Sequence, residues 1–77
     1  MNNKQRKQLK ELKQSVQYVR DDVEIMRDDE QEKLDNMPES LLGTEKEDHY
    51  NNSILWLNDI IEKLDDAIAE FDEEGWV

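Results

Sequence analysis

The sequence has 77 residues, of which 21 are Asp or Glu and 10 are Lys or Arg, so its formal net charge is −11. It contains no cysteine, which excludes disulfides, thiolate metal sites and thiol nucleophiles. The negative balance argues against direct binding to nucleic acid or to an anionic membrane. The longest apolar run, residues 54–57, is far shorter than the ~20 residues that span a bilayer. The basic N-terminus also lacks the apolar segment of a signal peptide, so we expect a single small cytoplasmic domain.

Apolar residues recur in two runs at alternating spacings of three and four, which predicts two amphipathic helices rather than a disordered chain. We assign both runs to the a and d positions of heptads. The first run comprises Leu9, Leu12, Val16, Val19, Val23 and Met26, and the second comprises Tyr50, Ile54, Leu57, Ile61, Leu64, Ile68 and Phe71.

In chain order, the first helix is predicted over about residues 5–36, because Pro38 cannot lie inside a helix. A turn follows over 37–44. The sequence Thr44-Glu45-Lys46-Glu47 has the pattern of a capping box, in which Thr44 and Glu47 each accept from the other's amide. The second helix is therefore predicted over about 45–74, with Gly75 as its left-handed C-terminal residue.

Two long helices and one short connection predict an all-α fold, an antiparallel, coiled-coil-like two-helix hairpin that forms a single unit over residues 1–77. A turn centred near residues 40–41 places residue i level with residue 81 − i. Glu30 then lies near His49 and Tyr50. It either forms a polar layer, hydrogen-bonded to one of them, or belongs to a ligand pocket at the turn end.

Apolar residues outside the a and d positions collect on one flank of the predicted hairpin. A two-helix hairpin buries one seam only, which is rarely enough for a stable fold. The flank is therefore either the remaining core of a homodimeric four-helix bundle or a docking surface for a different protein, unless these are scattered surface residues without a role. Its residues, at c and g positions, are Tyr18, Ile25, Trp56, Ile60 and Ala67.

The negative charge is concentrated near the predicted turn. Residues 1–20 carry +5 and lie beside residues 61–77 at −6, whereas residues 21–60 carry −10. This face either serves solubility or meets a basic partner. Because B-DNA carries one charge per ~1.7 Å, a rod covered with carboxylates can imitate DNA in a nucleic-acid-binding cleft. The candidate residues are Asp21, Asp22, Asp28, Asp29, Glu32, Asp35 and Asp59.

The acidic end of the first helix is followed by the turn Asn36-Met37-Pro38-Glu39-Ser40-Leu41. Residues 19–72 resemble small acidic helical-hairpin proteins of Gram-positive bacteria and their phages, which carry a similar helix end, an Asn-Met/Leu-Pro-Glu-Ser-Leu turn and an acidic second helix. The resemblance implies a phage-type context and a small protein that binds a host or defence enzyme. The basic first 20 residues and the region of Trp56 do not match that group.

Enzymatic function is not predicted, because the sequence has one His, no Gly-rich phosphate loop and no Ser-His-Asp arrangement. We predict no catalytic, cofactor-binding or metal-binding residue. The predicted function is a phage- or prophage-type interaction module that binds and inhibits a basic, nucleic-acid-handling host or defence protein through its acidic half. The alternative is a purely structural four-helix-bundle dimer with a solubilising surface.

Overall fold

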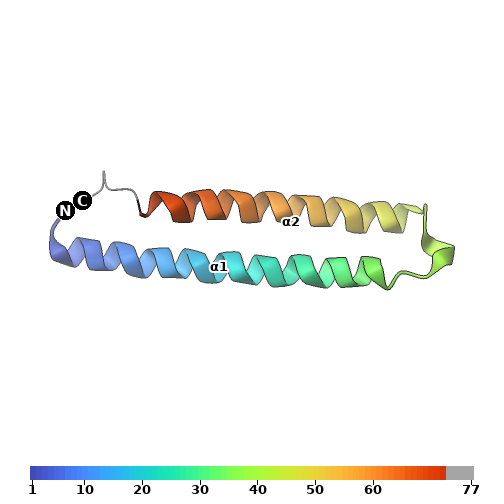
Figure 1. Cartoon of the computed structure of the whole chain (residues 1–77), viewed down its shortest axis with the longest axis horizontal. Coiled ribbons are helices and arrows are strands. Elements are labelled where there is room, and N and C mark those ends of the chain that lie inside the picture. The colour runs from blue at the N-terminus through green and yellow to red at the C-terminus, as the bar shows by residue number, and fades with distance from the viewer. Residues whose placement is uncertain (73–77) are drawn as a thin grey trace.

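The computed structural model describes residues 1–72 as two long α-helices joined by a short loop (Figure 1). Helix α1 spans Asn3–Asp35 and helix α2 spans Glu45–Glu70, with a single 3-10 turn, Glu39–Leu41, between them. The helices pack antiparallel along their length in a rod of 60 × 17 × 12 Å. The predicted all-α fold with two packed helices is confirmed. We call the end that holds residues 36–44 the loop end and the opposite one the open end.

Local side-chain chemistry fixes both ends of α1. At its start, the Asn2 side chain accepts from the Gln5 amide at 2.8 Å and the Gln5 side chain accepts from the Asn2 amide at 3.1 Å. This reciprocal pair is a capping box that satisfies two otherwise unpaired amides. At its end, the Asn36 amide donates to the Glu32 carbonyl at 3.0 Å, and Pro38 follows in an extended conformation.

The predicted capping box of the second helix is wrong, although Thr44 is the N-cap residue. The Thr44 hydroxyl turns back into the loop and donates to the Leu41 carbonyl. Glu47 instead accepts from the Gly43 amide at 2.5 Å. Gly43 has φ +78°, a left-handed conformation that favours glycine, and this orients its amide toward the first turn of α2.

Helix α2 ends at Glu70, where the sequence predicted an end near Glu74. The predicted cap, Gly75, lies outside the described residues.

The buried residues of the seam all lie on α2. They are Ile54, Leu57 and Ile61, whereas α1 has no buried residue. From α1, the seam uses mainly a and e positions, which are half-buried: Leu9, Lys13, Val16, Arg20, Val23, Arg27, Glu30 and Leu34.

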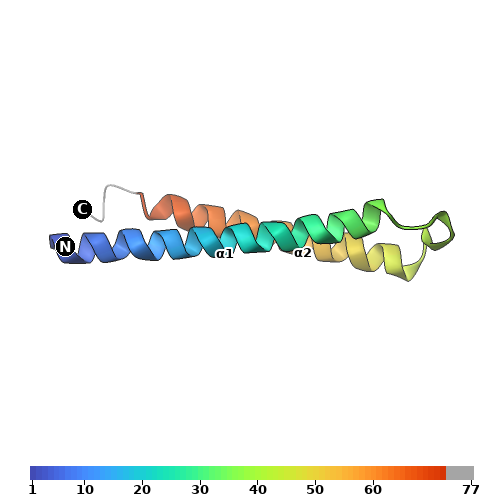
Figure 2. The same cartoon turned by 90° about the horizontal axis from the view of Figure 1, so that it is seen from below.

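The predicted d positions of the first helix do not lie in the seam. Leu12, Val19 and Met26 are 51%, 52% and 57% exposed. Relative to an a/d seam, α1 is rotated about its axis by about 50°, half of the 100° step between consecutive residues. At the edge of the seam, basic e residues therefore stand where an a/d seam would have these three apolar d residues. Each e residue directly follows one of them in the sequence. Seen at right angles to the first view, the two helices cross at a shallow angle (Figure 2).

We expect the substitution Ile61→Ala to destabilise the protein by about 2–4 kcal/mol, because it removes the most buried side chain and leaves a cavity. Leu55→Ala is the matched control on the same helix, since Leu55 is 67% exposed, and we expect a change within about 0.5 kcal/mol. Urea unfolding followed by circular dichroism measures both. Equal losses in the two variants would contradict the assignment of the seam.

Candidate functional site

Three polar contacts between e positions close one side of the seam, and we call them the ladder. The Lys13 ammonium contacts the Asp72 carboxylate at 2.6 Å. The Arg20 Nε donates to Asp65 Oδ1 at 2.9 Å, and the Arg27 Nη1 donates to Asn58 Oδ1 at 3.1 Å. The hydrogen bond with Asp65 raises the pKa of Arg20 above its ordinary value. The ladder therefore holds one edge of α1 against α2.

The contacts of the ladder run diagonally across the seam. In each of the three contacts the two residue numbers sum to 85. Side chains of a helix lean toward its N-terminus, so long side chains of two antiparallel helices meet at residues that are not level. Leu9 and Phe71, which the predicted register places level, line the same surface hollow.

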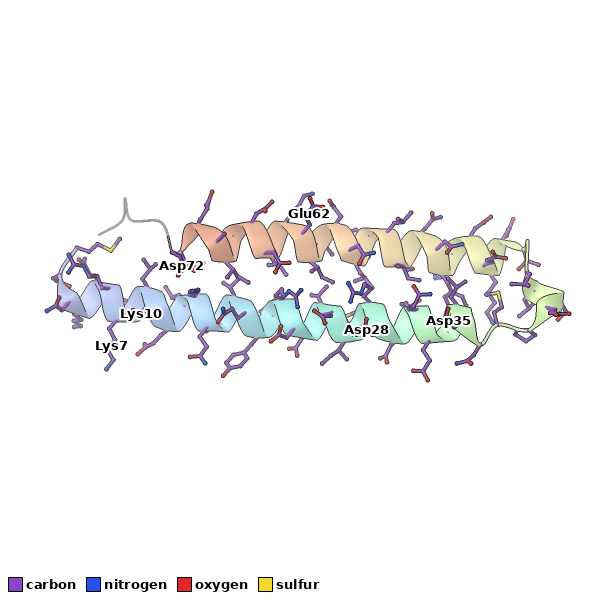
Figure 3. The ribbon with its side chains drawn as sticks, in the orientation of Figure 1. Lys7, Lys10, Asp28, Asp35, Glu62 and Asp72 are labelled. Atoms are coloured by element: carbon purple, nitrogen blue, oxygen red, sulfur yellow. The ribbon has the colours of Figure 1, made fainter. Side chains whose placement is uncertain are left out.

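Three of the predicted acidic residues form a line on α1, and we call this line the acidic row. Asp21, Asp28 and Asp35 share the f position of successive heptads and are exposed. Their spacing of seven residues places them about 10 Å apart along the helix. Figure 3 shows Asp28 and Asp35 toward the loop end of α1, and Lys7 and Lys10 toward the open end. The charge therefore changes sign along one helix.

The charge density of this part of α1 is close to that of a nucleic-acid strand. Residues 21–35 contain eight acids against Arg27 and Lys33, a net charge of −6. They span about 21 Å, so one net charge falls on about every 3.5 Å, compared with 3.4 Å along one strand of B-DNA.

The other four predicted acidic residues lie off the row. Asp22 and Asp29 occupy g positions, nearer the side of α1 opposite the ladder. Glu32 is exposed, and its side chain and that of Asp22 form no hydrogen bond or ion pair with any of residues 1–72. Asp59 belongs to the outer face of α2, where it accepts from Lys63 at 2.8 Å. The structure thus separates Asp59 from the acidic row.

The predicted hydrogen bond from Tyr50 or His49 to Glu30 is wrong. Glu30 does lie at the seam, but it accepts from Lys33 of its own helix at 3.1 Å. This hydrogen bond raises the pKa of Lys33, and the hydrogen bond that Lys63 donates to Asp59 raises the pKa of Lys63. Both contacts therefore stabilise the fold at neutral pH, and their contribution is lost only as the pH rises above the ordinary lysine value of 10.5.

The predicted ligand pocket at the loop end is a small surface hollow. Its volume of about 150 Å³ is half of the lower limit typical of small-molecule sites. It is lined by Lys33, Asn36, Met37, Pro38, Leu41, Lys46 and Tyr50. Within residues 1–72, no group of three or more His, Asp or Glu residues is placed to hold a metal ion.

An exposed apolar surface lies on the side of the seam opposite the ladder, and we call it the apolar flank. Of the predicted patch, Trp56, Ile60 and Ala67 of α2 lie on this side. The rotation of α1 turns its c residues, Tyr18 and Ile25, to the face opposite the seam, and Tyr18 lines a surface hollow with Arg20 and Asp65 of the ladder. Tyr18, Ile25 and Trp56 are exposed, and Ile60 and Ala67 are half-buried beside α1. The rotation of α1 extends this surface, because d positions adjoin the same side. The apolar flank therefore comprises Leu12, Val19, Met26, Trp56, Ile60 and Ala67.

Comparisons with protein-family models, with curated proteins and with solved structures found no match to this chain. Neither helix, within the described part of the chain, is long and apolar enough to cross a membrane. The two surfaces are therefore interpreted from their chemistry.

Our reading of the sequence missed the ladder, although a signal for it was present. Lys13, Arg20 and Arg27 recur every seven residues, each directly after an apolar d residue. Asn58, Asp65 and Asp72 recur at the same interval in the second helix. Two complementary series at e positions, which meet across an antiparallel seam, favour an a/e interface over an a/d interface.

The acids at the end of α1 oppose the helix dipole, so Asp35→Asn should stabilise the fold by about 0.3–1 kcal/mol. Glu47→Gln is the matched control with the opposite sign, because Glu47 lies in the first turn of α2 and accepts from the Gly43 amide. Thermal melts at low and high salt measure both, and the gain for Asp35→Asn should shrink as salt screens it. A lower melting temperature for Asp35→Asn would contradict a destabilising role of this acid.

Proposed function

We propose that the protein is an interaction module whose acidic loop half binds a basic protein and inhibits it. The observation that carries this proposal is the pairing pattern. Basic residues of the first 20 meet acids in or just after the last turns of α2, as in Arg20–Asp65 and Lys13–Asp72. The acids of residues 21–60 outnumber their local cations by ten. The charge that remains unneutralised is therefore local and lies near the loop end.

The proposed mode of inhibition is imitation of nucleic acid. The charge density along residues 21–35 supports it, as does the rod, whose two thinner dimensions are 17 and 12 Å. A rigid helix holds its carboxylates in fixed positions, so a basic cleft loses little entropy in meeting them. The resemblance of the turn to phage-type proteins supports a host or defence enzyme as the target.

We expect Asp21, Asp28 and Asp35, changed together to Asn, to reduce capture of basic proteins from a bacterial lysate by roughly tenfold. The control variant changes Glu62 and Glu70 to Gln and Asp66 to Asn. It removes the same three charges from the exposed face of α2 near the open end. Captured proteins are quantified by mass spectrometry at low and high salt.

Capture should weaken steeply with salt, since screening shortens the reach of the carboxylates. Equal losses in both variants would show that total charge, rather than the acidic row, is responsible. Captured proteins that duplex DNA fails to displace would contradict imitation of nucleic acid while leaving binding by the acidic row intact.

A second candidate function, self-association into a four-helix bundle, is favoured by the rotation of α1. Burying one Leu, Val or Met side chain contributes about 1.5–3 kcal/mol, and partly exposed ion pairs contribute much less. A lone hairpin would therefore be expected to turn Leu12, Val19 and Met26 into its seam. Leaving them outside is energetically reasonable when a second surface covers them.

We expect the protein to sediment at twice the 9.2 kDa mass of the chain and Trp56→Glu to weaken self-association by more than about tenfold. Leu55→Glu is the matched control. Leu55 and Trp56 are neighbours and both 67% exposed, but Leu55 occupies a b position on the other side of α2. Sedimentation velocity measures all three proteins. A folded monomeric wild type would exclude self-association.

A further inference from the structure

We propose that the outer face of α1 docks into a protein groove that otherwise holds a single strand of nucleic acid. The inference rests on the proposed function and narrows its partner class. We call the exposed f, c and g residues of 18–35 the mixed face, because apolar and acidic side chains alternate on it. They are Tyr18, Asp21, Asp22, Ile25, Asp28, Asp29, Glu32 and Asp35.

Two apolar side chains occupy the middle of the mixed face. Tyr18 and Ile25 are 62% and 61% exposed. Because α1 meets α2 through its a and e positions, the c positions of these two residues lie directly opposite the seam. The Tyr18 hydroxyl accepts from Gln14 Nε2, one turn away, at 3.1 Å, which holds the ring along the helix. The rest of residues 1–72 therefore leaves both side chains largely uncovered.

Carboxylates surround these apolar side chains. Residues three and four positions apart are neighbours on a helix surface. Ile25 has four such neighbours, and all of them are aspartates: Asp21, Asp22, Asp28 and Asp29. Tyr18 shares the first two of these neighbours. A partner that docks here thus meets apolar side chains between two lines of carboxylates, and it needs both an apolar floor and cations on either side.

The carboxylates of the mixed face are accessible to a partner's cations. Asp22 and Glu32 form no hydrogen bond or ion pair with any of residues 1–72. Asp21 and Asp28 each contact the arginine that precedes them, but both aspartates remain mostly exposed. Exposed ion pairs of this kind contribute at most about 1 kcal/mol. Contacts within the hairpin therefore do not prevent these acids from binding a basic groove.

The pattern fits a single strand of nucleic acid better than a duplex. One net charge per about 3.5 Å along residues 21–35 matches one strand, whereas duplex B-DNA carries one charge per ~1.7 Å. Grooves for single strands combine cations that follow the backbone with aromatic side chains on which unpaired bases stack. In a duplex the faces of the bases are already stacked on one another, so a duplex has no equivalent of Tyr18 and Ile25.

A second copy of the chain does not suit the mixed face. Each copy carries a net charge of −11, and two mixed faces would repel each other through their aspartates. The apolar flank reaches α1 at its d positions, beyond Asp22 and Asp29. A second copy on the apolar flank would therefore leave the c and f residues of the mixed face uncovered. Charge complementarity favours a basic partner for this face.

Competition between two forms of DNA tests the partner class. Proteins captured from a bacterial lysate are displaced with a single-stranded oligonucleotide or with a duplex of equal phosphate number, and are quantified by mass spectrometry. Only proteins whose capture is lost with Asp21, Asp28 and Asp35 changed to Asn are scored. We expect the single strand to displace them at a roughly tenfold lower concentration, because it also occupies the apolar floor of the groove. The duplex still competes for the same cations.

The substitution Ile25→Ala tests the apolar part of the mixed face without changing its charge. We expect it to reduce capture of the scored proteins by roughly tenfold, because it removes apolar area that the groove would cover. Leu55→Ala, an exposed aliphatic residue on α2, is the matched control and should leave capture unchanged. Circular dichroism confirms that both variants keep their helices.

The outcomes separate this inference from the proposed function. A duplex that displaces the scored proteins as readily as the single strand, or unchanged capture by Ile25→Ala, would overturn the inference and leave imitation of nucleic acid standing. Displacement by neither form of DNA would overturn imitation. If no captured protein depends on the acidic row, the proposed function itself is wrong.

Discussion

The ladder of Lys13, Arg20 and Arg27 determines which side of α1 meets α2, and the surfaces of the protein follow from that choice. Its contacts are partly exposed, so each contributes modestly to stability. Their number and equal spacing nevertheless select one rotation of a helix that is otherwise apolar on two adjoining sides. The selected rotation places the apolar d residues of α1 outside the seam. Weak polar contacts thus determine which apolar side chains of α1 are buried in the seam and which remain exposed.

The a/e seam of α1 also explains why few residues are buried. Three buried residues, all on α2, face a line on α1 that alternates aliphatic and charged side chains. Long Lys and Arg side chains cover part of that seam with their methylene groups while their charged ends reach solvent and acids. Such a seam orients two helices well but buries little area. The structure is therefore consistent with a hairpin that obtains part of its stability from a second packing surface.

Much of the fold could be predicted from the sequence because its strongest signals are local. Periodicity located both helices, Pro38 located the end of α1, and Thr44 located the start of α2. The rotation of α1 could not be obtained from apolar spacing alone, because Leu9, Val16 and Val23 are shared by an a/d and an a/e seam. The rotation depends on pairing between residues about 30 to 60 positions apart. Similarly, the acidic residues were recognised by type, but only the structure separates Asp59 from the acidic row.

The structure divides the acidic residues by the two surfaces that it forms. Asp21, Asp28 and Asp35 lie on a line of α1 away from the apolar flank, so a second copy on the flank would leave them accessible. Burial of the apolar flank by a second copy would depend little on salt, because it would rest on apolar contacts. Capture of a basic partner weakens as salt screens the acidic row. Salt therefore distinguishes two functions that share the same helix.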